Sequence, residues 1–145
     1  MSALWDSAQA RYAQAVAHLG EVRRDYRLGG VRVRLCSAGA AYGPVFDAAL
    51  QHRVDTEGES ALTFHLWESA CSGVPGPDSP ANLETWQQEQ VVDPRGVLHQ
   101  ADPEVWAAFD LGSYTLSLLA ADARTGFYWV ADVAALPHYE QGSPL

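Results

Sequence analysis

The chain has 145 residues, about one domain, and 48% of them are hydrophobic, so it can bury a continuous core without disulfides or a bound metal. All nine basic residues are arginines, which excludes a phosphate-binding loop with its lysine, a Schiff-base lysine and a kinase strand lysine within these residues. The formal net charge of −9 would repel nucleic acid and acidic membranes over most of the surface, so neither is expected as a partner.

The first predicted element is an amphipathic helix over residues 3–22. Its apolar side chains recur at three- and four-residue steps: Trp5, Ala8, Tyr12, Ala15, Val16 and Leu19. A second short helix is predicted over residues 43–52, where Pro44 occupies the first turn. No stretch has the pattern of a signal peptide or reaches membrane-spanning length, so we expect a soluble, cytoplasmic domain.

A β-hairpin is predicted between the two helices, over residues 25–35. Gly29 and Gly30 separate two alternating segments and suit a two-residue turn that needs positive φ angles. The resulting register pairs Tyr26 with Val33 on one face of the hairpin. That face is apolar throughout and is expected to point toward the core.

The other face of the predicted hairpin carries three arginines. Arg27 stands across from Arg32, with Arg34 and Asp25 beside them. Like charges opposed across strands are unfavourable unless an anion or an acidic surface lies between them, so this face is a candidate site for a partner or an anion. The alternative is a solvated face on which the arginines pair with Asp25 and neighbouring acids.

Strict alternation of apolar and polar residues predicts a further strand over residues 62–67. One side carries Leu62, Phe64 and Leu66, and the other carries Thr63, His65 and Trp67. His65 and Trp67 could therefore line a binding surface, or they could pack under a helix or a loop. The Pro-, Gly- and Ser-rich residues 69–82 are predicted to form a long loop, and loops of this length are usually functional or mobile.

The remaining residues are predicted to be rich in β-structure. Four strands are expected, at residues 88–92, 97–100, 113–121 and 127–133, and the last two are apolar on both faces, which suits a central position. The fold class is therefore α+β: one domain over residues 1–145, with a mostly antiparallel twisted sheet of about five to seven strands and both helices packed on it.

No motif for metal or cofactor binding is present in the sequence. The five histidines and two cysteines lack metal-ligand spacing, and no glycine-rich phosphate loop occurs, so we expect neither a metal nor a cofactor. The densest group for an unrecognised carboxylate/His site consists of Asp93, His99, Asp102 and Glu104. Two Asp-Pro steps within it are explained more simply by turn formation.

Several short strings resemble those of a known family. They are Leu62-Thr-Phe-His-Leu-Trp-Glu-Ser69, Ser72-Gly-Val-Pro75, Pro94-Arg-Gly96, Phe127-Tyr-Trp-Val-Ala-Asp132 and Leu136-Pro-His-Tyr-Glu-Gln-Gly-Ser-Pro-Leu145. From about Tyr26 to Leu145 the chain resembles the N-terminal region of bacterial proteins related to HPr serine kinase/phosphorylase. In that family this region precedes a P-loop kinase domain, and the catalytic motifs of that domain match no position here.

The resemblance implies a non-catalytic accessory domain that recognises a protein or peptide partner, with a kinase domain in cis or in trans. The candidate contact residues are Arg27, Arg32, Arg34, His65 and Trp67. Two alternatives remain open. One is a free-standing small binding or regulatory protein, and the other is an enzyme that uses the carboxylate/His group.

Overall fold

The structure, a computed structural model, describes residues 3–50, 59–77, 91–92, 97–101, 104–110, 115–120, 122 and 124–136. The helices are α1 (Ala3–Leu19), α2 (Gly43–Leu50), the single-turn α3 (Ser69–Ser72) and the 3-10 helix η2 (Val133–Ala135). Both predicted helices are present, but α1 ends at Leu19, short of the predicted residue 22, because Gly20 takes a positive φ of 77° and β1 begins at Glu21. No helix of the described residues combines the length and apolarity needed to cross a bilayer.

The described strands form one open sheet. They are β1 (Glu21–Leu28), β2 (Val31–Ala38), β3 (Leu62–Glu68), β4 (Val91–Val92), β5 (Val97–Ala101), β6 (Val105–Asp110), β7 (Thr115–Ala120) and β8 (Thr125–Val130). Their order is β1-β2-β3-β8-β7-β6-β5-β4, and β2, β3 and β8 run parallel while the other neighbours are antiparallel. The predicted α+β class with a mostly antiparallel sheet is confirmed.

Apart from shifts in the ends of some strands, the sequence-based prediction of the elements after the hairpin was wrong at three points. First, β6 was missed: its two alanines favour strands weakly, and it brings the total to eight strands, one above the predicted range. Second, residues 69–72 form α3 instead of the start of a loop, and Gly73 ends that turn with a φ of 70°. Third, β8 ends at Val130, and η2 follows it. Residues 78–82 of the predicted loop lie outside the described residues.

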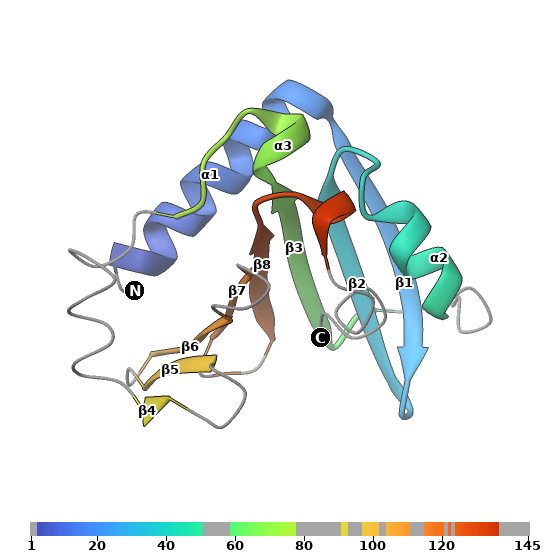
Figure 1. Cartoon of the computed structure of the whole chain (residues 1–145). Coiled ribbons are helices and arrows are strands. Elements are labelled where there is room, and N and C mark those ends of the chain that lie inside the picture. Colours follow the sequence, from blue (N-terminus) through green and yellow to red (C-terminus); the bar gives the residue numbers. More distant parts are fainter. Residues whose placement is uncertain are drawn as a thin grey trace.

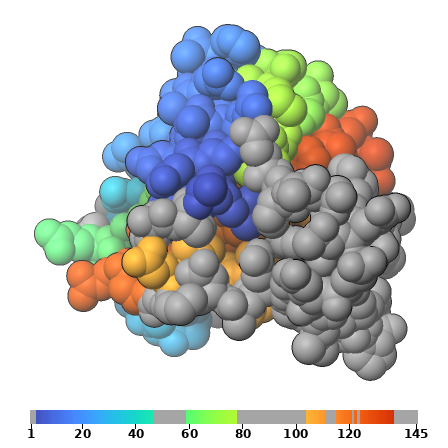
Figure 2. Space-filling model, turned by 90° about the vertical axis from the view of Figure 1, so that its left-hand side faces the viewer, coloured from blue at the N-terminus to red at the C-terminus, as the bar shows by residue number. Residues whose placement is uncertain are grey.

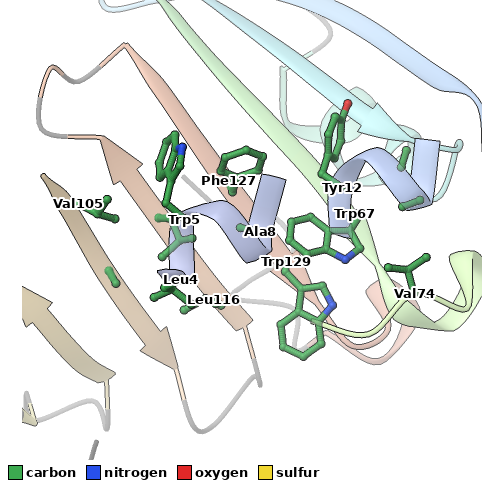
Figure 3. Close-up of a cluster of buried hydrophobic side chains, with 14 of the residues drawn as sticks. Leu4, Trp5, Ala8, Tyr12, Trp67, Val74, Val105, Leu116, Phe127 and Trp129 are labelled. Carbon is green, nitrogen blue, oxygen red and sulfur yellow. The ribbon is translucent and has the colours of Figure 1, made fainter. Parts of the chain in front are cut away.

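Two hydrophobic clusters occupy the two faces of the sheet. Helix α1 covers the first, which we call the α1 face, and places Trp5, Ala8 and Tyr12 against Trp67 and Phe127. Figure 3 shows these side chains between the helix and the strands. Figure 2 looks onto this side, with α1 in blue lying across it and the segment around α3 in green beside it. Strand side chains that lie beneath α1 on this face therefore pack against the helix and are shielded from solvent.

The opposite face of the sheet carries the second cluster, which we call the α2 face. Tyr42 and Phe46 from α2 and the segment before it pack with Tyr26, Leu66 and Tyr128 from the strands. Figure 1 shows α1 and α2 on opposite sides of the sheet. Strand β8 is buried on both faces, as its apolar character predicted, whereas Ser117 and Leu119 on β7 are only half-buried, so the prediction holds for one of the two strands.

Candidate functional site

The β1-β2 hairpin has the register that the sequence predicts. Tyr26 pairs with Val33, and Arg27 lies opposite Arg32. The guanidinium groups do not simply face each other, because Arg32 turns to Asp25 and donates from Nη2 to Oδ2 at 2.9 Å. This contact relieves the repulsion that the cross-strand arginine pair would otherwise carry.

Asp25 holds a second arginine at the same time. Arg34 Nε donates to Asp25 Oδ1 at 2.9 Å, and its Nη2 donates to Oδ2 at 3.3 Å. Hydrogen bonds from Arg34 lower the pKa of the Asp25 carboxyl below its ordinary value, with Arg32 adding to the effect. Asp25 is therefore ionised at neutral pH and fixes both guanidinium groups in place.

Arg27 is the exposed member of this group. Its Nη1 donates to the carbonyl of Gly30 at 3.5 Å, a long contact within the turn. We call Asp25, Arg27, Arg32 and Arg34 the arginine hairpin; these four side chains carry three positive charges and one negative charge. The structure thus brings the three predicted arginines onto one face, and it also shows pairing with Asp25. Arg32 is only 5% exposed, however, so of the three predicted contact residues Arg27 and Arg34 are the accessible ones, and Arg32 supports them from below.

The two other predicted contact residues, His65 and Trp67, share the α1 face but differ in exposure. Trp67 has 0% exposure, and its Nε1 donates to the carbonyl of Pro75 at 3.3 Å, so it belongs to the core and reaches no partner-binding surface. That part of the predicted site is wrong, because α1 and the segment after α3 cover the strand end. His65 is half-buried and lines a cavity.

The cavity lies between α1 and the sheet and has a volume of about 410 Å³. Its lining residues come from α1, β1, β3 and β8: Trp5, Gln9, Tyr12, Ala13, Val16, Glu21, His65, Thr125 and Phe127. The residues from α1 recur at helical spacing, so one stripe of the helix forms the wall. Glu21 follows directly after the chain reversal at Gly20, which brings its carboxylate beside the same stripe.

The polar end of the cavity is built from Tyr12 and Glu21. The Tyr12 hydroxyl donates to Glu21 Oε2 at 2.8 Å, and Arg23 Nη2 lies 3.4 Å from Glu21 Oε1. Burial raises the pKa of Tyr12 well above its ordinary value, and the hydrogen bond to Glu21 adds to the rise, so the phenol keeps its proton. Neither residue was a sequence-based candidate, since Tyr12 has the periodicity of a core residue and Glu21 belongs to no motif.

His65 forms part of the cavity floor. Its Nδ1 lies 3.4 Å from the carbonyl of Gly126, and its ring contacts Tyr12 and Phe127 at centroid distances of 5.0 and 5.2 Å. Burial lowers the pKa of His65 below its ordinary value of 6.5, so the ring is neutral at pH 7. Cys36, its partner across the β2-β3 pairing, is also buried, and that burial raises the pKa of the thiol.

The shifted pKa of His65 makes the stability of the domain depend on pH. The unfolded chain binds a proton at His65 near pH 6.5, whereas the folded protein binds it only at lower pH, so the free energy of unfolding should fall as the pH drops from about 7 toward 5. Urea unfolding at a series of pH values measures the slope. In His65→Asn, which keeps a donor toward Gly126, the slope should be smaller; an unchanged slope would assign the effect to other groups.

The segment after β3 is fixed by side-chain hydrogen bonds. Ser69 Oγ donates to the carbonyl of Val74 at 2.8 Å and accepts from Trp129 Nε1 at 3.0 Å. At the end of β3, Glu68 is 2% exposed, and its Oε2 accepts the backbone N–H of Val133 at 2.7 Å. This part of the chain therefore ties β3, α3 and η2 together.

The carboxylate/His group cannot be assembled from the described side chains. Asp93 and Asp102 lie outside the described residues, as does the side chain of His99, and Glu104 is exposed. Within the described ranges, no group of three or more His, Cys, Asp or Glu side chains is placed to hold a metal ion.

Comparison of the chain with models of protein families, with curated proteins and with solved structures finds no match. The arginine hairpin and the cavity must therefore be interpreted from their own chemistry.

Proposed function

We propose that this chain is a non-catalytic recognition domain that binds an acidic segment of a protein partner through the arginine hairpin. We propose further that a kinase-like domain, in the same polypeptide or in a separate one, supplies the catalytic activity, as the resemblance to the HPr kinase group suggests. The proposal also places the recognition domain in the cytoplasm, where thiols stay reduced; Cys36 and Cys71 are both free cysteines.

The observation that carries the proposal is the organisation of the hairpin by Asp25. One carboxylate positions Arg32 and Arg34, while Arg27 stays exposed beside them. Fixed guanidinium groups lose little entropy when a carboxylate binds, and their forked donors suit carboxylate geometry. On a chain with a net charge of −9, such a basic surface would orient an acidic partner during the approach.

The position of the hairpin favours contact with another chain. Strand β1 is at one edge of the sheet, and among the described strands it pairs only with β2. A partner segment could therefore reach the accessible guanidinium groups of Arg27 and Arg34 together with the edge of the sheet. Figure 1 shows β1 and the hairpin tip at the periphery of the molecule.

A hexaglutamate peptide is a suitable probe of this surface. We expect it to shift the backbone NMR signals of β1 and β2, with an affinity that falls several-fold when ionic strength rises from about 0.05 to about 0.3 M. Arg27→Glu should abolish the binding. The matched control is Arg124→Glu, which reverses the charge of another exposed arginine. This variant should retain most of the affinity for the peptide.

Three outcomes would contradict the proposal. They are the absence of binding, an affinity that does not depend on salt, and an equal loss in the two charge-reversal variants. The last would show that the peptide responds to the net charge of the protein and not to the hairpin.

A further inference from the structure

The cavity between α1 and the sheet is separate from the arginine hairpin and has its own chemistry. Its volume of about 410 Å³ falls within the range of roughly 300–1,000 Å³ that small-molecule sites occupy. Aromatic rings form part of its lining, and two of them, Trp5 and Phe127, meet edge to face at a centroid distance of 4.9 Å. Figure 3 shows both rings on the side of α1 that faces the sheet.

Three polar side chains of the cavity offer hydrogen-bond acceptors to a ligand, beside the uncharged polar groups of Gln9 and Thr125. Glu21 is a carboxylate and can only accept, and the Tyr12 hydroxyl already donates its proton to Glu21, so its remaining capacity is to accept. At His65 the neighbouring carbonyl of Gly126 can only accept, which assigns the proton to Nδ1 and leaves Nε2 as an acceptor in the neutral ring. Three acceptors from three separate elements thus line one cavity.

Such a set of acceptors selects a ligand that brings donors. An ammonium group offers three N–H donors and a positive charge, which complements the Glu21 carboxylate and is attracted to the faces of neighbouring aromatic rings. An anionic ligand would instead be repelled by the Glu21 carboxylate, and the donors that Gln9 and Thr125 offer on the cavity wall are uncharged. The apolar members, among them Val16 and Phe127, suit a hydrocarbon body behind the charged head.

We propose that this cavity is a binding site for a small organic amine, with the ammonium group held by Glu21, Tyr12 and His65 and an aromatic or aliphatic body packed against Trp5 and Phe127. The site goes beyond the proposed recognition of an acidic partner, because it uses other residues and a ligand of opposite charge.

Three probes of similar size and different charge test the proposal on the intact chain: 2-phenylethylammonium, 2-phenylethanol and 3-phenylpropionate. In NMR titrations we expect the amine to shift the signals of α1, β3 and β8. The alcohol should bind at least tenfold more weakly, and the carboxylate should show no saturable shift. Signals of β2 near Arg32 should stay unchanged, which separates this result from the test of the arginine hairpin.

Two variants and a control complete the experiment. Glu21→Gln keeps an acceptor for Tyr12, so the fold should persist, but the loss of charge should weaken amine binding at least tenfold and leave the alcohol unaffected. Ala13→Phe fills the cavity from an exposed helix position and should abolish binding of every probe. Glu104→Gln removes one negative charge from an exposed residue that does not line the cavity and should leave the affinity for every probe unchanged.

Equal affinity for the amine and the alcohol would overturn the proposal, because it would show that the acceptors do not select the ligand. Tighter binding of the carboxylate, or no binding of any probe, would overturn it as well. If the amine binds but Ala13→Phe has no effect on it, the ligand lies elsewhere on the protein and the assignment to this cavity fails.

Discussion

Replacing Trp67 with alanine is expected to lower the free energy of unfolding by about 3–5 kcal/mol, the cost of removing a large aromatic side chain from a packed core. Trp67 is fully buried and meets Tyr12 and Phe127 at centroid distances of 6.4 Å. Its indole N–H also donates a hydrogen bond to the carbonyl of Pro75. The substitution therefore removes a contact of the segment after α3 as well as core packing. Urea denaturation followed by far-ultraviolet circular dichroism measures the change.

The matched control is the same substitution at an exposed tryptophan. Trp106 on β6 is 45% exposed, so Trp106→Ala should cost less than about 1 kcal/mol. Trp67→Phe keeps an aromatic ring but loses the N–H donor, so its loss of unfolding free energy should lie between those of Trp67→Ala and Trp106→Ala. If Trp67→Ala and Trp106→Ala were equally mild, α1 would not be packed on the sheet as described.

Glu68→Ala is expected to cost about 1–3 kcal/mol, because it leaves the buried N–H of Val133 without its acceptor. Glu68 is 2% exposed and ends β3, and its contact fixes the start of η2 after β8. The nearby thiol of Cys71 reports on the same carboxylate, since the hydrogen bond with Glu68 raises the pKa of Cys71. Urea unfolding measures the loss of stability.

Glu68→Gln distinguishes the hydrogen bond from the charge. Glutamine keeps an oxygen acceptor for the Val133 N–H and removes the negative charge, so its cost should stay below about 1 kcal/mol. In Glu68→Ala, thiol titration should also show a pKa of Cys71 closer to its ordinary value of 9.0. An alanine variant as stable as the original protein would show that the contact with Val133 contributes little.

The sequence predicted the features that depend on neighbouring residues. The Gly29-Gly30 turn and the alternation on either side of it determine the hairpin register, and the pairs Tyr26–Val33 and Arg27–Arg32 are confirmed. Both longer helices were also predicted, since apolar periodicity and a proline in the first turn are local signals. For the same reason, the alternation of the hairpin is sufficient to assign the three arginines to one face.

The features that the sequence did not predict depend on contacts between distant segments. The β2-β3-β8 parallel arrangement leaves no periodicity that distinguishes it from an antiparallel one. His65 and Trp67 were correctly assigned to one side of their strand, but the sequence did not show that α1 covers that side and buries only one of them completely. The cavity joins Tyr12 and Glu21 to His65 across three elements, so no local pattern could indicate it.

The parallel pairing of β3 with β8 also has a kinetic consequence. It joins Thr63 to Thr125, so all of β4, β5, β6 and β7 lies within the loop that this pairing closes. The chain must lose the entropy of closing that loop before the contacts between the two strands can compensate for it. The hairpin on one side and the antiparallel strands on the other can each form from near neighbours. We therefore expect the pairing of β3 with β8 to be the slow, non-local step in the assembly of this sheet.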